Sequence, residues 1–334
     1  MSITSEATRV LSTVLYRSGL LAPLSGAVGY VRMVKGFSVL GFHRVNDDND
    51  PFMPSLATTL FAARMEHIAR YYTVLTVEDL VERLRQGQVP RRALALTFDD
   101  GYRDNLTHAA PILARYGLPA TIFLTTGCIG TREALWFDRL ALALKTTTET
   151  HLRLAGGAEL LLASTADRLR ALAVALGHLK GLPDVERRQS LEQLLRELGG
   201  GSTDSPKRLM LSWDEVGVLR GLGFSVGAHT VSHPILSRLS PEEARREIND
   251  SKAAIERGLG TRPRAFAYPN GGAEDVNELT VRLVKEAGFT CAVTTRRGLN
   301  TSSTPLLELR RGGPWERHLP TYALKLARYQ QTGA

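Results

Sequence analysis

The motif ALALTFDDGY places two adjacent carboxylates directly after an apolar, strand-like run. Asp99 and Asp100 follow the alternating Ala and Leu residues, and Gly101 comes next. Adjacent acids at the end of a buried strand are unfavourable unless one of them is paired or binds a cation. The motif therefore indicates a catalytic or metal-binding centre, although a structural Asp-Gly turn has the same letters.

Two histidines stand four residues apart in FSVGAHTVSHP, again just after a strand-like run. On a helical turn, His229 and His233 would point the same way and could hold one metal ion. With one aspartate they form a two-histidine, one-carboxylate ligand set, which suits zinc or another divalent ion. Two exposed loop histidines are the structural alternative.

From residue 37 onward, short β-rich runs alternate with longer helical patterns. The strand-like runs are FSVLGFH, YTVLT, ALALTF, ATIFLT, FSVGAH, AFAYP, CAVTT and LLELRR. Helices are expected near 59–71, 76–86, 103–116, 240–258 and 275–287. This alternation predicts an α/β fold of seven or eight parallel βα units, arranged as a deformed (β/α) barrel. The carboxyl ends of its strands, where both motifs lie, form the catalytic face of such barrels.

Four segments are expected along the chain. Residues 1–36 form an N-terminal helical segment, 37–311 form the barrel, and 312–334 form a C-terminal helical tail. Residues from about 133 to 207 interrupt the βα rhythm, because Leu, Ala, Glu and Arg dominate and no clear strand run occurs. We expect a helical insertion there.

The N-terminal segment has apolar residues at helical spacing with basic residues around them. They are Val10, Leu11, Val14, Leu15 and Leu21, with Arg9, Arg17, Arg32 and Lys35. Such a helix could lie on a membrane surface or pack on the barrel wall, and both alternatives stay open. The segment does not read as a secretory signal, because charged residues interrupt its apolar run. We therefore expect a cytoplasmic protein, with peripheral association at the inner face of the membrane as the open alternative.

The composition limits the partners and the redox chemistry. The net charge is +8, but Lys and Arg are scattered along the chain without a block, so we expect no nucleic-acid partner. Cys128 and Cys291 lie in apolar runs without a CxxC pair, which indicates buried reduced thiols. No uninterrupted 18-residue apolar stretch is present, which argues against a membrane-spanning helix.

The sequence TFDDGY, followed by HTVSH in a chain of alternating β and α segments, resembles the NodB-type polysaccharide deacetylases of carbohydrate esterase family 4. The resemblance covers most of residues 37–311 and is weaker in the insertion. It implies that Asp100, His229 and His233 hold one divalent metal ion and that Asp99 is the general base. Zinc is the favoured ion, with cobalt and nickel as alternatives.

The resemblance also requires a catalytic acid. The late His318, in PWERHLP, does not match the family's usual leucine-histidine motif, whereas GFHRVNDD places His43 at the end of the first strand. This arrangement resembles the permuted subgroup of exopolysaccharide N-deacetylases, in which an early histidine has the acid's role. His43 is therefore the expected acid; a histidine at the edge of the core is the structural alternative.

The remaining family positions match less closely. The segment AFAYPNGG lacks the usual arginine that orients the base, so Arg310 or Arg311 is expected in that role. The residues expected to line the cleft or to stabilise the oxyanion are Tyr268, Pro269, Asn270, Trp136, Asp138 and Trp213. Each tryptophan suits core packing equally well.

The expected function is metal-dependent hydrolysis of an N-acetyl group. The substrate would be an N-acetylhexosamine-containing polysaccharide or its lipid-linked precursor, and the products would be acetate and a free amine. The same site could instead cleave an O-acetyl ester, an imide or a formamide. A carbohydrate-binding scaffold without catalysis is the non-enzymatic alternative. The oligomeric state stays open.

Overall fold

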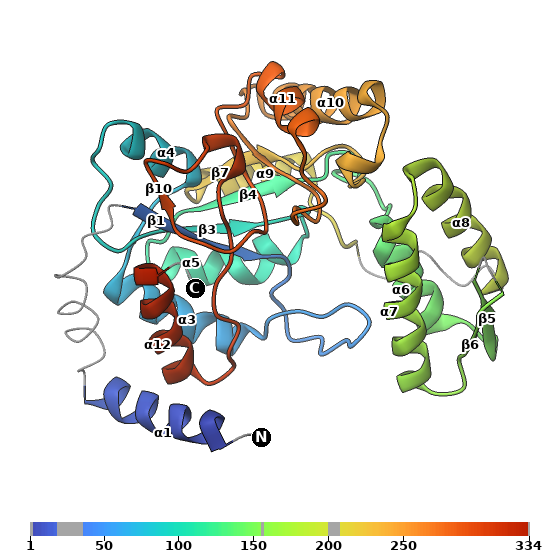
Figure 1. The fold of residues 1–334 in the computed structure, drawn as a ribbon, viewed down its shortest axis with the longest axis horizontal. Helices are drawn as coiled ribbons and strands as arrows, with labels where there is room; N and C mark the ends of the chain where they lie inside the picture. Colours follow the sequence, from blue (N-terminus) through green and yellow to red (C-terminus); the bar gives the residue numbers. More distant parts are fainter. Residues whose placement is uncertain (1–2, 19–35, 155–156, 200–207, 333–334) are drawn as a thin grey trace.

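The structure, a computed structural model, describes residues 3–18, 36–154, 157–199 and 208–332 (Figure 1). Within these residues, a mixed sheet of eight strands lies at the centre, in the order β10-β1-β3-β4-β7-β8-β9, with β2 beside β3. Its strands are β1 (Gly36–Phe42), β2 (Thr73–Val74), β3 (Ala93–Phe98), β4 (Ala120–Leu124), β7 (Phe224–Ala228), β8 (Ala265–Ala267), β9 (Cys291–Val293) and β10 (Asn300–Thr301).

Helices surround the sheet. Around the barrel they are α3 (Thr58–Tyr71), α4 (Val77–Arg85), the π-helix η1 (Asn105–Ala109), α5 (Ala110–Arg115), α9 (Trp213–Gly221), the 3-10 helix η2 (Leu236–Arg238), α10 (Pro241–Leu259), α11 (Glu278–Glu286) and the 3-10 helix η3 (Leu306–Glu308). The strands pair in parallel except β10, which pairs antiparallel with β1. This arrangement confirms the expected α/β fold with a deformed barrel.

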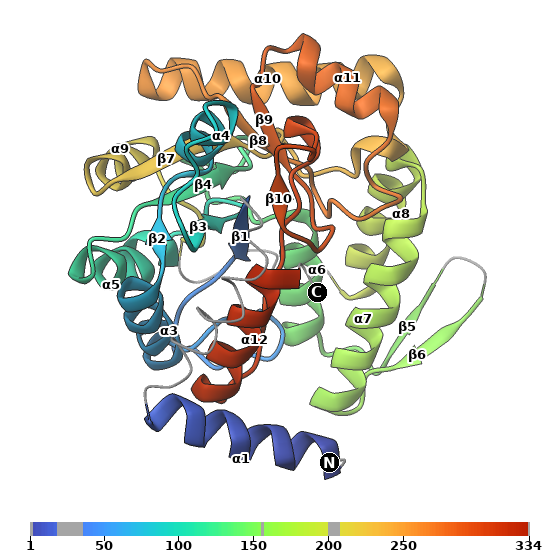
Figure 2. The same cartoon turned by 60° about the vertical axis from the view of Figure 1, so that its left-hand side comes forward.

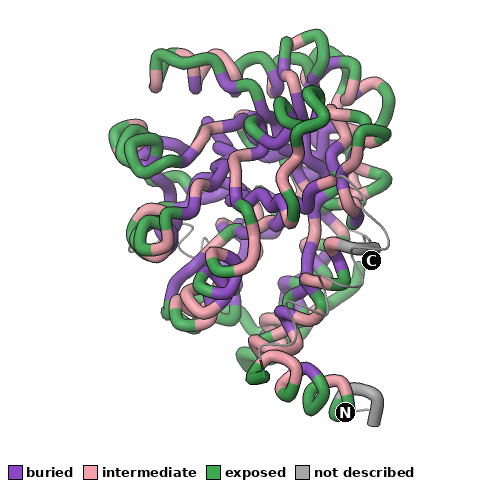
Figure 3. Tube along the Cα trace, turned by 90° about the vertical axis from the view of Figure 1, so that its left-hand side faces the viewer, coloured by how far each residue is buried: buried purple, intermediate pink, exposed green. Residues whose placement is uncertain are grey.

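The alternation of side chains along β3 explains how the barrel is filled. All six residues of this strand are buried, as parallel strands covered on both faces require. Buried positions gather in the middle of the molecule, and exposed ones lie mostly at its outside (Figure 3). Ala93 and Ala95 share a buried cluster with Phe37 of β1 and Ala265 of β8, so they face the barrel interior. The small alanines fit this narrow interior, while the leucines between them pack against the outer helices.

Residues 309–312 join β9 to β1 and so complete the barrel wall. The Leu309 N–H donates to the carbonyl of Ala292 at 2.8 Å, and the Gly312 N–H donates to the carbonyl of Val39 in β1 at 3.0 Å. The segment forms one β-bridge with β9 rather than a regular strand. The prediction of a strand at LLELRR is therefore wrong: its first three residues form η3, and only Leu309 bridges β9.

The side chain of Asn300 takes the place of a pairing strand beside Arg310. Its Oδ1 accepts a hydrogen bond from the Arg310 N–H, and its Nδ2 donates to the Arg310 carbonyl, both at 2.8 Å. These bonds satisfy the backbone groups that a neighbouring strand would otherwise pair. The predicted helix over 103–116 is also modified, to η1 followed by α5, because Pro111 lacks the N–H that would continue the helical ladder.

A separate group of elements lies beside the barrel (Figure 1). It contains α6 (Trp136–Thr146), a hairpin of β5 (His151–Arg153) and β6 (Glu159–Leu161), α7 (Thr165–Gly181) and α8 (Asp184–Glu197). These elements have their own buried cluster, which includes Leu140, Leu152, Leu179 and Leu194. The hairpin has no counterpart among the sequence expectations, because strands of three mostly exposed residues carry little apolar alternation. Residues 200–207, at the end of the expected insertion, lie outside the described residues, and its boundaries stay a prediction.

The two terminal helices pack side by side, as Figures 1 and 2 both show. α1 (Ile3–Arg17) contacts α12 (Leu319–Thr332), where the Ser12 and Thr321 hydroxyls lie 3.1 Å apart. The remaining expected N-terminal positions, Leu21, Arg32 and Lys35, lie outside the described residues. Among the described helices, none has the length and apolar character needed to cross a bilayer.

Candidate active site

The carboxyl ends of three strands of the sheet, β1, β3 and β7, bring the candidate catalytic residues together. His43 follows β1, Asp99 and Asp100 follow β3, and His229 follows β7. Together with other side chains they line one open cavity of about 460 Å³. Parallel strands place their carboxyl ends at one edge, so residues far apart in the sequence meet here.

Asp100, His229 and His233 form a compact cluster. The Nε2 atoms of His229 and His233 lie 3.6 Å and 3.5 Å from Asp100 Oδ1, and all three residues are buried. Asp100 Oδ1 has no hydrogen-bond partner. One donor atom from each of the three residues lies within 4.8 Å of the others.

This cluster fits a metal ion. The Nδ1 of His229 lies 2.7 Å from the carbonyl of Ala267, which fixes Nδ1 as the protonated nitrogen and leaves the Nε2 lone pair facing Asp100. The imidazole lone pair and the partnerless carboxylate oxygen are both acceptors with no hydrogen-bond donor between them. A divalent cation would supply the missing positive charge. Two histidines and one aspartate are a ligand set that zinc and related ions accept.

Burial sets the protonation of these ligands in the absence of an ion. Desolvation lowers the pKa of His229 to about 4 and that of His233 well below its usual value. Desolvation and the neighbouring Asp99 charge raise the pKa of Asp100 well above its usual value. Both imidazoles are therefore neutral near pH 7, which is the form that binds metals.

The backbone around the cluster is held in an uncommon conformation. Asp100, Thr230 and His233 have φ angles of 76°, 66° and 58°, in the left-handed region that residues with a Cβ rarely adopt. The Thr230 Oγ1 accepts a hydrogen bond from the His233 N–H at 3.1 Å and so helps to fix the second histidine. Such local strain commonly accompanies functional sites.

Asp99 forms a buried ion pair with Arg311. The Nη1 and Nη2 atoms of Arg311 donate to Oδ1 and Oδ2 at 2.6 Å and 2.7 Å. Burial raises the pKa of Asp99, but the Arg311 guanidinium, together with His229 and His43, outweighs this effect and brings the pKa well below the usual value. Of the two arginines expected near the base, Arg311 is the one that reaches it, whereas the Arg310 side chain lies against Gly298.

His43 faces Asp99 across the same cavity. Its Nε2 lies 3.9 Å from Asp99 Oδ2, and 60% of its side-chain surface is exposed. Desolvation by the cavity walls lowers the pKa of His43, and the Asp99 carboxylate opposes this by raising it. Asn105 Nδ2 donates to the His43 carbonyl at 2.7 Å, which anchors the backbone at this position.

Two further expected residues line the cavity. Asn270 lines the cavity, and its Nδ2 has no hydrogen-bond partner. This amide group can therefore donate a hydrogen bond to a ligand. Asp138 lies at the wall, where its Oδ2 accepts a hydrogen bond from the Tyr102 hydroxyl at 2.8 Å. Desolvation raises the pKa of Asp138 to about 7.

The other four expected cleft residues lie outside this cavity. Trp136 is buried, and its Nε1 donates to the His233 carbonyl at 3.1 Å. Tyr268 is buried, and its hydroxyl donates to the Leu307 carbonyl; Pro269 is buried beside it. Trp213 packs on α10 at Gly258, where an added Cβ would lie 2.4 Å from the indole.

Several cavity residues were not identified from the sequence. Leu172, Leu176 and Lys180 come from α7, so the helices beside the barrel supply one wall. Arg44 and Tyr102 line another part, with the Arg44 guanidinium 5.1 Å from the Tyr102 ring centre. No pattern in the sequence of α7 predicts that this helix lines the cavity. Arg44 and Tyr102, in contrast, stand next to motif residues.

Comparisons with known proteins point to one family. A family model described as polysaccharide deacetylase matches residues 86–292. The putative polysaccharide deacetylase YxkH of Bacillus subtilis is 21% identical over 275 residues, which cover 82% of this chain and 69% of that protein.

Solved structures show the same fold. The Streptococcus pyogenes deacetylase PplD, in complex with acetate, superposes with a TM-score of 0.56 at 21% identity, over 84% of this chain and 92% of that one. A de-N-acetylase from Aggregatibacter actinomycetemcomitans gives a TM-score of 0.53 at 16% identity, over 83% and 94% of the two chains. The family match covers more than half of this chain and includes both chemical motifs. It confirms the family expected from those motifs: this chain belongs to the polysaccharide deacetylases, which are hydrolytic enzymes acting on carbohydrates.

Proposed function

We propose that this deacetylase is metal-dependent and removes N-acetyl groups from N-acetylhexosamine units, giving acetate and a free amine. The proposal rests on one observation: the adjacent side chains of Asp99 and Asp100 have different partners. Asp100 lies with two histidines in a ligand cluster, whereas Asp99 is kept ionised by Arg311 at the edge of the same cavity. A site with one carboxylate in the ligand cluster and a second, ionised one outside it suits hydrolysis better than binding alone.

The ion would be held by Asp100, His229 and His233. It would polarise the acetyl carbonyl and make water more acidic. Zinc is the favoured ion, because three nitrogen and oxygen ligands with an open position are typical of catalytic zinc sites. Cobalt and nickel are the alternatives.

Asp99 is the proposed general base. The Arg311 guanidinium holds both of its oxygens in place and keeps the carboxylate ionised. An ionised carboxylate beside the cavity can accept the proton that the attacking water loses. Arg311 is thus the residue that orients the base. In other members of the family, an arginine in another segment usually has this role.

His43 is the proposed general acid. Its exposed imidazole lines the same cavity as the ligand cluster, 3.9 Å from Asp99 Oδ2, so it can donate a proton to the departing amine nitrogen. The free Nδ2 of Asn270 can donate a hydrogen bond to the developing oxyanion. Trp136 would act indirectly, through its hydrogen bond to the His233 carbonyl.

Two names among the relatives support an acetamide as the reacting group. One structural neighbour is called a de-N-acetylase. A stretch of 53 residues is 47% identical to part of PdaC of Bacillus subtilis, a peptidoglycan-N-acetylmuramic acid deacetylase, although it covers only 11% of that protein. The proposed substrate is therefore an acetylated amino sugar within a polysaccharide or its lipid-linked precursor.

Membrane association would bring the enzyme to a lipid-linked substrate. In α1, Val10, Leu11 and Val14 are 61%, 56% and 59% exposed. The peripheral association and the cytoplasmic location expected from the sequence stay predictions.

The test is acetate release from N-acetylglucosamine oligomers and lipid-linked acetylated sugars by the zinc-loaded protein. Asp99→Asn should abolish release while the metal content stays unchanged, and Asp214→Asn, at an exposed position on α9, should retain it. Acetylated xylan serves as the ester comparison. Release from xylan but from no acetamide would overturn the proposed substrate, despite one bound metal per chain.

A further inference from the structure

Helix α6, the first helix of the group beside the barrel, begins with three residues that each contact a metal-binding motif. Trp136 Nε1 donates to the His233 carbonyl at 3.1 Å. The Phe137 ring packs on the imidazole of the same histidine, with 5.2 Å between the ring centres. Asp138 accepts a hydrogen bond from the hydroxyl of Tyr102, in the motif after β3. We propose that Phe137 is a positioning residue for His233, so that metal binding depends on the elements beside the barrel. This inference rests on the proposed function, because it assumes a bound metal ion.

The two histidines of the cluster are held in different ways. His229 Nδ1 lies 2.7 Å from the Ala267 carbonyl, which is the usual arrangement of a metal-ligating imidazole. His233 Nδ1 is buried, and no other residue in the described part of the chain accepts a hydrogen bond from it. The rings of His229 and Phe137 contact the His233 imidazole instead, with centres 4.8 Å and 5.2 Å away and planes at 79° and 74°. Packing against Phe137 therefore takes the place of the hydrogen bond that would otherwise orient His233.

The backbone of His233 also depends on α6. Its φ angle of 58° is a left-handed conformation, which persists only where the surrounding structure holds it. The His233 N–H donates to Thr230 Oγ1 in the same loop, whereas its carbonyl accepts from Trp136 of α6. The hydrogen bond from Tyr102 to Asp138, 2.8 Å long, joins the same turn of α6 to the segment after β3. One helical turn thus contacts both segments that supply the proposed ligands.

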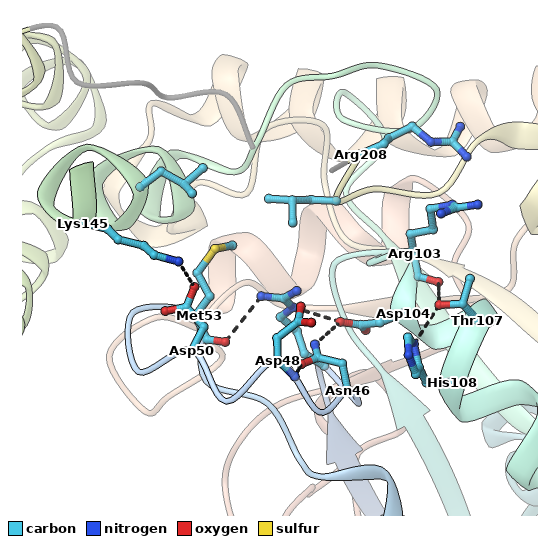
Figure 4. A pocket seen from close by; sticks show the side chains of 13 residues that line it. Asn46, Asp48, Asp50, Met53, Arg103, Asp104, Thr107, His108, Lys145 and Arg208 are labelled. Atoms are coloured by element: carbon cyan, nitrogen blue, oxygen red, sulfur yellow. Dashed lines mark hydrogen bonds and ion pairs between the residues drawn. The ribbon is translucent and has the colours of Figure 1, made fainter. Parts of the chain in front are cut away.

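Contacts at both ends of α6 hold this turn in place. At its start, the guanidinium carbon of Arg187 in α8 lies 4.7 Å from the centre of the Trp136 ring, and Arg187 pairs with Asp184. At its other end, Lys145 Nζ lies 2.7 Å from Asp50 in the loop after β1 (Figure 4). Between them, α6 packs in the buried cluster of its own group of helices. The orientation of the second histidine is therefore set by contacts that lie outside the barrel.

The experiment measures zinc affinity of the full chain by competition with a chromophoric chelator. Phe137→Leu keeps an apolar side chain but removes the ring, so the Kd for zinc should weaken by about tenfold or more, as is usual when a group that orients a ligand is lost. Phe137→Tyr keeps the ring, and its Kd should stay within about twofold of the wild type. Phe52→Leu is the matched control and should leave the Kd unchanged. Phe52 lines the same cavity but makes no ring contact with a proposed ligand among the described residues.

Cobalt provides a readout of ligand geometry that does not depend on turnover. In cobalt-loaded protein, Phe137→Leu should shift or weaken the visible d–d absorption bands of the ion, whereas Phe52→Leu should leave them unchanged. Trp136→Phe is a second variant, because it keeps an aromatic ring and removes the donor to the His233 carbonyl. Its Kd for zinc should weaken by about threefold or more. Denaturant titration of the metal-free proteins establishes that each variant is folded.

The outcomes separate the positioning role from the proposed function. Unchanged zinc affinity and cobalt bands in folded Phe137→Leu and Trp136→Phe would overturn the positioning role and leave metal-dependent deacetylation intact. A wild type that binds no divalent ion would overturn both. Weaker zinc binding in Phe137→Leu, together with a wild type that releases no acetate from any acetamide, would support the positioning role and overturn the proposed substrate.

Discussion

Arg311 and Asp99, which are 212 residues apart in the sequence, meet in a bidentate ion pair with N–O distances of 2.6 Å and 2.7 Å. Both side chains are almost completely buried, at 4% and 3% exposure. The pair joins the segment that closes the barrel to the carboxyl end of β3. It therefore connects the last part of the catalytic wall with the proposed base.

Replacing Arg311 should affect both stability and the pH profile. Arg311→Met leaves the buried Asp99 without its partner, so the free energy of unfolding should fall by about 3–5 kcal/mol. Since Arg311 lowers the pKa of Asp99, its loss should raise that pKa. The acidic limb of kcat/KM should consequently move to higher pH.

Arg311→Lys keeps the charge but not the two-pronged geometry and should give an intermediate effect. Arg310→Met is the matched control, because that side chain does not reach the base, and its pH profile should match the wild type. An unchanged acidic limb in folded Arg311→Met would contradict the positioning role of Arg311.

Removing a proposed ligand should abolish the stabilisation that zinc provides. With free zinc at about 100 times its Kd, binding should stabilise the wild type by about 2.7 kcal/mol relative to protein in chelator. His229→Gln and Asp100→Asn should show almost no difference between the two conditions. Thermal unfolding with metal analysis measures this, with His151→Gln as the control. A wild-type shift in either ligand variant would refute the assigned ligand set.

Trp213 should be important for stability and not for substrate binding. Trp213→Ala removes an indole that packs on Gly258, and we expect a loss of about 2–4 kcal/mol. KM for N-acetylglucosamine oligomers should change less than twofold, because the indole lies outside the catalytic cavity. Denaturant titration and steady-state kinetics together test this; a large KM increase at unchanged stability would restore the cleft role expected from the sequence.

His67 should make the protein less stable in mild acid. It is buried, and desolvation, with Arg70 and Arg92, lowers its pKa to about 4 from about 6.5. Between these values the unfolded chain binds the proton and the folded chain does not, so stability falls as pH decreases from about 6.5 towards 4. The expected slope is at most about 1.4 kcal/mol per pH unit.

Denaturant titrations of metal-free wild type and His67→Phe across this range provide the test. Metal-free protein is used because His229 then contributes equally to the pH dependence of stability in both proteins. The difference in stability between them therefore reports on His67 alone. The difference in stability between the two proteins should change with pH below 6.5 and stay constant above it. A constant difference throughout would show that His67 does not titrate as its burial implies.

The local sequence was sufficient to predict the residues at the centre of the site. The buried strand that ends in Asp99 and Asp100, and the strand followed by His229 and His233, are short-range patterns, and the carboxyl ends of parallel strands bring them together whatever the loops do. For the same reason most strands and the helices around the barrel were predicted close to their observed bounds. The hairpin β5–β6 was not, because its strands are too short and exposed to carry a pattern.

Tertiary structure alone decided the choices between neighbouring residues. Arg310 and Arg311 are equivalent in the sequence, but consecutive residues of an extended segment point to opposite sides, and the register set by Asn300 and the bridge to β9 directs Arg311 to Asp99. Trp213 packs on Gly258, and Lys180 of α7 lines the catalytic cavity. Both positions result from contacts between segments that are distant in the sequence. The sequence by itself thus determined the chemistry and the parallel framework, which depend on local periodicity. The positioning of the base and the walls around it depend on long-range packing, which no local pattern encodes.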